Sequence, residues 1–450
     1  MSEISLVNGK ETLKLTEWEL GNLHLPPVTT VTLYEGSVPV EYLRGRIEMM
    51  LKKNPWLTSR IVKKSTTDGV VAMTYTRGFD AKSAVEDHFT VFRSGEVSLS
   101  LNLPYEKLVD CLKPVQCARS KQATDENEVL FKVAIVPIEA QTGGTEKTMP
   151  LQQNIDLPGF ALVVSMNHTM GDGHTYYSLY SMLGMDTEMA ELDPVRVSGF
   201  EAAKTAIIGK RETAMLNSAG LGLGIVGTYL GAKFGRRVPQ NVHVNEVNSA
   251  WLTKEKVRAG EDAQVPFVSS NDVLTSWFFR KMETDLHLML GNFRNRQPSV
   301  LNLSNEHVGN YEANLPYFPG DIETPALIRQ SIQGSDGAFR AKRAGSPETE
   351  IPGFSKLLRN KVSIISNWAT FYSDVMLQGE AQDKYEGTLK PKLHFPVMEP
   401  DGIITSVWNS AIVFRPRAGD LGMLIITQLS ESELLTQEEE PERPLGKRIL

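Results

Sequence analysis

The residues best suited to chemistry stand in the segment NHTMGDG, which places His168 four residues before Asp172 and the glycine that follows it, Gly173. The pKa of an imidazole lies near neutral pH, so a histidine in a cleft can take the proton of an acceptor group as that group attacks a carbonyl carbon. This makes His168 the candidate general base, the alternative being a hydrogen-bonded histidine of the core. Asp172, across a turn loosened by glycine, is better suited to hold the backbone or an arginine than to accept a proton.

The segments on either side of this motif predict where its residues lie. The run FALVVSMNH ends at His168 and is rich in the residues that favour strands. After Gly173, Tyr176, Leu179, Tyr180 and Leu183 recur on one face of a helix. The motif is therefore expected at a strand-to-helix junction, which projects a side chain beyond the edge of a sheet.

The rest of the chain alternates strand and helix patterns, which favours an α/β fold. A strand over 28–36 precedes a helix whose core face carries Leu43, Ile47, Met50 and Leu51. We expect Ser270 or Asn271 to cap a later helix, residues 140–148 to form a surface loop, and residues 437–450 to form a solvated acidic tail. Further strands are expected in the runs LTSRIVKK, VLFKVAIVPI, VSIISNWATF, SAIVFRP and MLIITQL.

Composition narrows the classes of function. A chain of 450 residues exceeds one ordinary core, so two domains are expected, with a site between them. The net charge of -7 disfavours nucleic acid as a partner. Two cysteines are too few for a disulfide framework or a zinc site, and the N-terminal residues lack the apolar core of a secretory signal. We expect a cytoplasmic monomer that holds no metal, with peripheral membrane contact left open.

One uncharged, glycine-rich run spans residues 215–232, MLNSAGLGLGIVGTYLGA. It contains the spacing GxGxxG over Gly222–Gly227, but the residues before it, RETAMLNSA, have no strand pattern, which argues against a dinucleotide site. Gly227, Gly231 and Gly235 stand four residues apart and would give a helix a smooth packing face. The run is interpreted as a crossover loop or a buried helix, with contact to a membrane or an acyl chain as the alternative.

These motifs resemble a known superfamily, the one that contains BAHD acyltransferases, condensation domains of nonribosomal peptide synthetases, wax-ester synthases and chloramphenicol acetyltransferase. The HxxxDG motif near the first third of the chain is its signature. Four further segments resemble its elements in the same order: SSNDVLTSW at 269–277, HVGNY at 307–311, Ser366-Asn367-Trp368, and FRPRAGDLGMLIITQL at 414–429.

The resemblance implies a fold, a reaction and roles for residues. It implies two chloramphenicol-acetyltransferase-like domains, each a mixed β-sheet flanked by helices, with a channel between them. In that template His168 assists direct attack of an alcohol or amine on an acyl-CoA thioester, with no permanent cofactor. Trp368 would stabilise the oxyanion, and Ser366 would lie on the acceptor side. Either Arg294 or Arg296 would pair with Asp172, the alternative being that both are solvated arginines of the surface.

One element departs from the family. Where the sequence DFGWG is expected, this chain has YSDVMLQG at 372–379. Two alternatives therefore stay open: a non-catalytic member of the fold that binds a ligand or partner, and a condensation-type domain that forms amides. The expected division is a domain over 1–190 that carries HxxxDG, a crossover segment over 191–250, and a second domain over 251–450.

Overall fold

The structure of the chain is a computed structural model. The structure describes residues 5–7, 10–63, 71–139, 159–234, 240–261, 265–295, 301–332, 351–379, 387–400, 402–435 and 443–450. The predicted loop at 140–148 lies outside the described residues.

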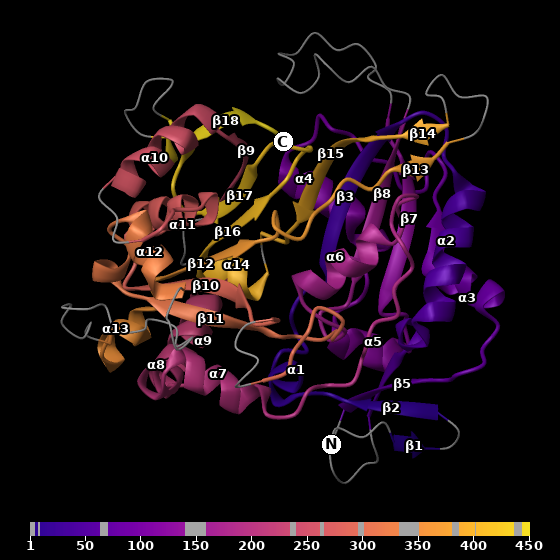
Figure 1. Ribbon diagram of the computed structural model, residues 1–450, viewed down its shortest axis with the longest axis horizontal. Helices are drawn as coiled ribbons and strands as arrows, with labels where there is room; N and C mark the ends of the chain where they lie inside the picture. The colour runs from indigo at the N-terminus through magenta and orange to yellow at the C-terminus, as the bar shows by residue number, and fades with distance from the viewer. Residues whose placement is uncertain are drawn as a thin grey trace.

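Two large mixed sheets lie side by side and form the two halves of the molecule (Figure 1). The sheet of the first half has the order β15 (Pro391–Val397), β3 (Val28–Glu35), β8 (Gly159–Met166), β7 (Phe131–Pro137) and β6 (Phe89–Val91). The sheet of the second half has the order β11 (Glu312–Tyr317), β10 (Leu286–Asn292), β12 (Val362–Asn367), β16 (Asn409–Phe414), β17 (Gly422–Thr427), β9 (Asn241–Val247) and β18 (Leu445–Arg448).

Two smaller sheets complete the β structure. One has the order β1 (Ser5–Val7), β2 (Lys10–Lys14), β5 (Val71–Tyr75) and β4 (Arg60–Lys63), and the other joins β13 (Leu377–Gln378) to β14 (Thr388–Leu389). The helices are α1 (Glu17–Gly21), α2 (Val40–Lys53), α3 (Ala81–His88), α4 (Tyr105–Leu112), α5 (Ser120–Glu126), α6 (Gly173–Ser181), α7 (Phe200–Ile208), α8 (Lys210–Leu216), α9 (Ala219–Lys233), α10 (Ser249–Glu261), α11 (Ser270–Met282), α12 (Pro325–Ile332), α13 (Phe354–Arg359), α14 (Ile403–Val407) and α15 (Glu431–Leu434).

Each half has its own core, and a third core joins them. In the first half, α2 and α6 pack on the sheet through the predicted apolar faces, and the four predicted residues of α2 are buried. In the second half, successive residues of β10 face opposite ways: Leu288 joins the core beneath α9 and α13, whereas Met289 joins the core beneath α10 and α11. The third core contains Val31 of β3 and Ile426 of β17, so apolar side chains of both large sheets pack together.

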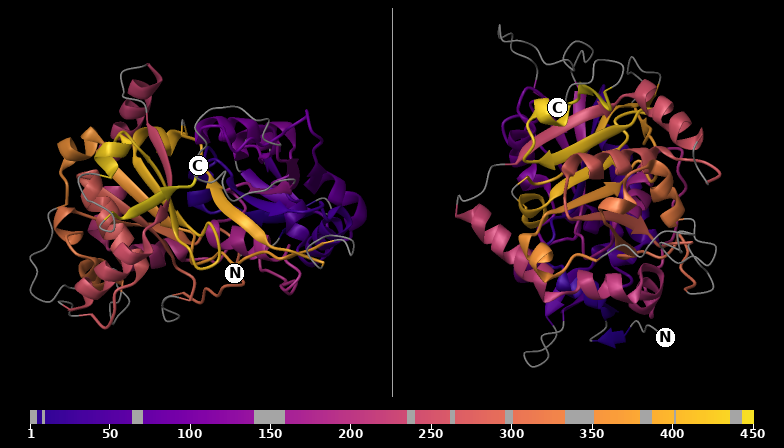
Figure 2. Two further views of the ribbon diagram at one scale, coloured as in Figure 1. Left: turned by 90° about the horizontal axis from the view of Figure 1, so that it is seen from above. Right: turned by 90° about the vertical axis from the view of Figure 1, so that its left-hand side faces the viewer.

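Two strands belong to sheets outside the predicted segments that contain them, and the predicted division at residues 190 and 250 stays a proposal. The strand β15, within 251–450, pairs antiparallel with β3 and becomes the edge of the first sheet. Figure 2 shows this strand, in orange-yellow, crossing toward the indigo half. The strand β9, within the predicted crossover, belongs to the second sheet. The two halves are therefore tied by an exchanged strand as well as by a shared core.

The chain end differs from its prediction. Residues 437–450 were expected as a solvated tail, but β18 pairs with β9, and Leu445, Ile449 and Leu450 are buried. The reason is that the acidic cluster gives way to the pattern PLGKRIL, whose apolar residues complete the second sheet and the core between the sheets.

The glycine-rich run is also settled by the structure. It folds as α9, and the helix α8 precedes it instead of a strand, so the context of a dinucleotide site is missing. The glycines that pack are not those expected: a Cβ at Gly227 or Gly231 would meet nothing, whereas one at Gly220 or Gly224 would collide with α13. Among the described residues, no helix combines the length and the apolar character needed to cross a bilayer.

Candidate active site

The HxxxDG loop lies between β8 and α6, as predicted. Asn167 shapes the turn, because its side chain accepts a hydrogen bond from the Thr169 amide at 2.9 Å and donates one to the Ala118 carbonyl at 2.7 Å. Its neighbours in the loop are buried, whereas His168 is only partly so. The turn therefore directs the imidazole out of the core.

Asp172 is buried and all its hydrogen-bonding positions are used. One carboxylate oxygen caps α6 by accepting from the amide and hydroxyl of Thr175 at 3.0 and 3.1 Å. The other accepts from Arg294 Nη1 at 2.7 Å and from the Tyr311 amide at 2.9 Å. Burial opposes ionisation of Asp172, but the Arg294 charge and these hydrogen bonds outweigh it and hold the pKa of the carboxyl below its usual range. Asp172 is thus occupied as a structural anion.

Arg294 is the arginine that pairs with Asp172, while Arg296 lies outside the described residues. Its guanidinium also donates to the carbonyls of His307 and Gly309 at 2.8 and 2.9 Å. The pair therefore fixes the start of α6, from the first half, against the His307–Tyr311 segment of the second half. That segment is the one whose sequence resembles the family's Gly-Asn element.

Asn310, in this segment, sets the protonation of His168. Its Nδ2 donates to the His168 carbonyl at 2.9 Å and to Glu19 Oε1 at 3.1 Å, so the two acceptors fix which end of the amide carries the nitrogen. Its Oδ1 therefore faces His168 Nδ1 at 3.1 Å, and an oxygen there requires Nδ1 to donate. In neutral His168 the proton then resides on Nδ1 and the lone pair on Nε2.

The ring nitrogen that carries the lone pair is free to act as a base. In the part of the chain that the structure describes, no side chain or backbone group bonds to Nε2 of His168. Burial lowers the pKa of His168, although a hydrogen bond to its own backbone and the nearby Asp172, Asn310 and Glu19 partly oppose this. The Trp18 ring lies 5.8 Å from the imidazole. His168 is consequently neutral at pH 7 and can accept a proton.

Glu19 and Arg196 support this arrangement, and sequence analysis did not single out either residue. Arg196 Nε donates to Glu19 Oε1 at 2.9 Å, and its Nη2 donates to the carbonyls of Thr169 and Met170 within the HxxxDG loop. Glu19 is also the last residue of a capping box with Thr16. The spacing T-x-x-E could have marked the helix start, but it carries no sign that Glu19 turns inward toward the second half.

Ser366 lies near the end of β12, and Trp368 directly follows this strand. The Trp368 N–H donates to Ser366 Oγ at 3.1 Å, so it is engaged by the neighbouring hydroxyl in this structure. A Cβ added to Gly173 would lie 3.6 Å from Trp368 Nε1, which places the indole directly against the start of α6. Since Ser366 Oγ accepts this hydrogen bond, its own O–H remains available to donate.

A cavity of about 450 Å³ lies beside Ser366 and Asp172. It is lined by side chains of α6, of the second sheet and of α11, among them His174, Asn271, Glu312, Ser366 and Asn367. Burial, together with the negative charge of Asp172, raises the pKa of Glu312 to about 8, so this carboxyl is protonated at neutral pH and can donate a hydrogen bond. Within the described ranges, no three His, Cys, Asp or Glu side chains are grouped to bind a metal ion.

The segment in the place of DFGWG is packed rather than open. Val375 and Leu377 are buried in the core of the first half, and the Val375 carbonyl accepts a hydrogen bond from the Tyr34 hydroxyl at 2.7 Å. The Tyr372 ring stacks on His394 with their centroids 4.2 Å apart. The departure in sequence therefore keeps a structural role for this segment.

Comparison with known proteins identifies the fold. No protein-family model matches the sequence, and no curated protein is significantly similar to it. The solved structure of TRI101 from F. graminearum with ethyl coenzyme A superposes with a TM-score of 0.55 at 12% identity, covering 94% of this chain and 96% of that one. The condensation domain of the monacolin K polyketide synthase MokA superposes with a TM-score of 0.51 at 11% identity, covering 95% of each chain.

A third solved structure, also of a condensation domain, shows the same likeness. The first condensation domain of the calcium-dependent antibiotic synthetase superposes with a TM-score of 0.50 at 12% identity, covering 92% of this chain and 90% of that one. The chain has the α/β fold that TRI101 and the condensation domains share, so the fold predicted from the resemblance is confirmed.

Proposed function

We propose that this protein transfers an acyl group from a coenzyme A thioester to the hydroxyl or amine of a small molecule, with His168 as general base. The observation that carries the proposal is the hydrogen bond between His168 Nδ1 and Asn310 Oδ1, which leaves a neutral imidazole with its Nε2 lone pair free. The buried His394, by contrast, uses both ring nitrogens, with Thr32 and Tyr177.

In the proposed reaction, the acceptor oxygen or nitrogen bonds to the thioester carbonyl carbon while its proton moves to His168 Nε2. The negative charge then develops on the carbonyl oxygen, where the Ser366 hydroxyl, polarised by the Trp368 N–H, would stabilise it. The carbon–sulfur bond breaks next, and the thiolate takes the proton back from His168. Asp172 and Gly173 hold the start of α6 and exchange no proton.

The lining of the 450 Å³ cavity supports a donor with an amide-containing arm. Asn271, Ser366 and Asn367 offer amide and hydroxyl groups, and neutral Glu312 adds a donor. The pantetheine arm of coenzyme A carries two amides and a hydroxyl group that such a lining can hydrogen-bond. TRI101 was solved with ethyl coenzyme A, and in another structure with coenzyme A and deoxynivalenol.

The test is thiol release from a panel of acyl-CoA thioesters in the presence of pooled alcohols and amines. We expect His168→Ala to lower kcat by roughly 10²- to 10⁴-fold, the usual contribution of a general base. His24→Ala, which changes an exposed histidine, is the matched control and should keep full activity. Circular dichroism confirms that each variant is folded.

Three outcomes would contradict the proposal or part of it. Absence of thiol release with every thioester would favour a non-catalytic member of the fold that binds a ligand. Activity confined to thioesters on a carrier protein, with an amine acceptor, would favour a condensation-type reaction. Equal activity of His168→Ala and the wild type would remove His168 from the mechanism.

A further inference from the structure

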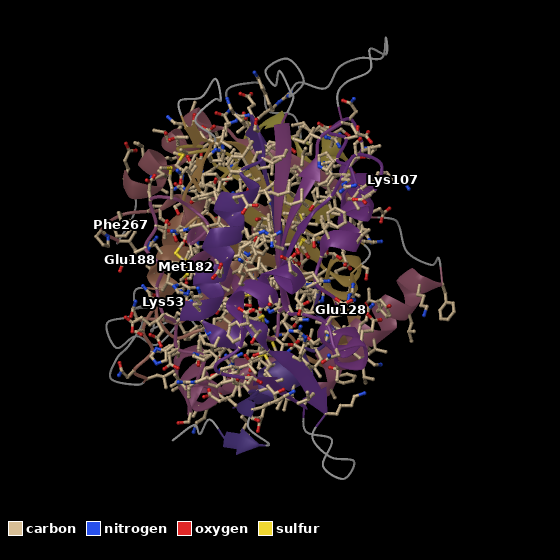
Figure 3. The ribbon with its side chains drawn as sticks, turned by 90° about the vertical axis from the view of Figure 1, so that its right-hand side faces the viewer. Lys53, Lys107, Glu128, Met182, Glu188 and Phe267 are labelled. Carbon is tan, nitrogen blue, oxygen red and sulfur yellow. The ribbon has the colours of Figure 1, made fainter. Side chains whose placement is uncertain are left out.

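The helix α9 presents an apolar face to solvent. Leu223, Val226 and Leu230 recur along one side of it and Phe234 follows, and these side chains are 44–72% exposed. No charged residue occurs between Ala219 and Ala232. In Figure 2, right, the helix extends outward from the body of the second half, and in Figure 3 it reaches past the outline of the molecule on the right. An exposed helix without a polar face is unusual for a surface in contact with water alone.

The apolar surface continues onto α13. This short helix packs closely against α9, because Gly220 leaves room for the Phe354 ring and Gly224 leaves room for the Leu357 carbonyl. Phe354 and Leu358 of α13 are 59% and 46% exposed. We name the six exposed side chains of the two helices the α9–α13 patch: Leu223, Val226, Leu230, Phe234, Phe354 and Leu358.

The charged residues of α9 and α13 themselves are all positive. Lys233 at the end of α9 and Lys356 and Arg359 on α13 are exposed, and residues 351–361 contain no acidic residue. The whole chain has a net charge of -7, so the charge of these two helices is opposite in sign to that of the chain as a whole. Apolar side chains beside Lys and Arg match the interface of a bilayer that contains anionic lipids.

The length of α9 decides how such contact would be made. Fifteen residues give a helix of about 22 Å, short of the roughly 30 Å that a spanning helix needs. We propose that the α9–α13 patch docks on the surface of an anionic phospholipid bilayer, with its apolar side chains among the acyl chains and its basic residues at the headgroups. This inference is independent of the proposed catalysis.

The test is co-sedimentation of the full chain with vesicles of phosphatidylcholine alone or of equal parts phosphatidylcholine and phosphatidylserine. We expect binding to the mixed vesicles, much weaker binding to phosphatidylcholine, and weakening by added salt. The double variant Val226→Glu/Leu230→Glu should bind the mixed vesicles about tenfold less or weaker. The double variant Lys356→Glu/Arg359→Glu should also bind the mixed vesicles about tenfold less. Its binding to vesicles of phosphatidylcholine alone should not change.

Val257→Glu is the matched control, because this valine of α10 is 59% exposed but lies outside the patch. The control and both double variants should keep the wild-type thermal unfolding temperature. No binding to mixed vesicles, or binding that the patch variants leave unchanged, would overturn the proposal. Light scattering that shows a dimer of the wild type, and a monomer of Val226→Glu/Leu230→Glu, would assign the patch to a second copy of this chain instead.

Discussion

At the scale of single residues, the proposed base depends on partners from distant parts of the chain. His168 lies in the first half, Asn310 in the second, and Glu19 near the N-terminus. In the described part of the chain Glu19 forms no hydrogen bond with the imidazole, yet it holds the Asn310 amide in the orientation that places an oxygen before His168 Nδ1. We therefore regard Glu19 as a positioning residue.

Glu19→Gln should disturb the tautomer of His168, since a glutamine can also donate and no longer fixes the Asn310 amide. We expect kcat to fall between about 10- and 100-fold with little change in KM, and ¹⁵N spectra of labelled histidine to show a population protonated on Nε2. Loss of the carboxylate also removes a charge that raises the pKa of His168, so the acidic limb of the rate profile should move to lower pH. Glu17→Gln, an exposed neighbour, is the control, and an unchanged tautomer would refute the assignment.

Asp172→Asn should act mainly on stability. The change leaves the Arg294 charge buried without its anion, which costs about 3 kcal/mol or more of the free energy of unfolding. Urea denaturation measures this loss, and Arg294→Lys should show part of it because an ammonium cannot replace the fork of hydrogen bonds. A fully stable Asp172→Asn variant with no activity would instead make Asp172 a participant in proton transfer.

At the scale of elements, the sequence predicted the type of a helix or strand better than the residues at which it begins and ends. The helix α11 was expected to begin with Ser270 or Asn271 as its cap, but Ser269 is the cap and forms a capping box with Asp272. The polar run Ser269-Ser270-Asn271 offers three residues that cap well, and only the backbone geometry selects among them. The carboxylate of Asp272 is held in addition by Arg329.

The assignment of the α11 cap can be tested by substituting two adjacent serines in turn. Ser269→Ala should lower the free energy of unfolding by about 1 kcal/mol, because the amide of Asp272 loses its acceptor. Ser270→Ala, within the first turn, should change it by no more than a few tenths of a kcal/mol. Equal effects of the two substitutions in urea denaturation would contradict the assigned cap.

At the scale of the whole molecule, three buried histidines make stability depend on pH. Burial lowers the pKa of His88 to about 4 and those of His287 and His394 to about 3, from the 6.5 of a free histidine. The folded state thus binds fewer protons than the unfolded state at mildly acidic pH. The contribution of these histidines to stability is therefore fully present above pH 6.5 and is lost as the pH falls below that value.

We expect each of these histidines to contribute about 1.4 kcal/mol per pH unit to the fall in the free energy of unfolding between about pH 6 and pH 4. Chemical denaturation at a series of pH values measures the slope. His394→Gln should reduce the slope by one histidine's share, and a stability that stays constant down to pH 5 would show that these rings are protonated in the folded protein.

The secondary-structure elements and the motifs could be predicted from the sequence, because they depend on residues that are neighbours along the chain. Apolar residues that recur on one helical face predicted α2 and α6, and runs of residues that favour strands predicted β3 and β8; the structure has each of these elements in the predicted part of the chain. The HxxxDG spacing named the candidate base and its aspartate, and the order of motifs along the chain predicted the fold. The same order of motifs offered two arginines, Arg294 and Arg296, as candidate partners of Asp172.

Features that depend on contacts between distant segments could be seen in the folded structure alone. It selected Arg294, brought Glu19 and Asn310 to His168, moved β15 into the first sheet and added β18 to the second. It also left the apolar side of α9 exposed. A carboxylate that turns inward and one that faces water have the same local sequence signature, because the difference lies in the electrostatic partner that folding supplies. Local patterns therefore fixed the elements, and long-range packing fixed the protonation of the site.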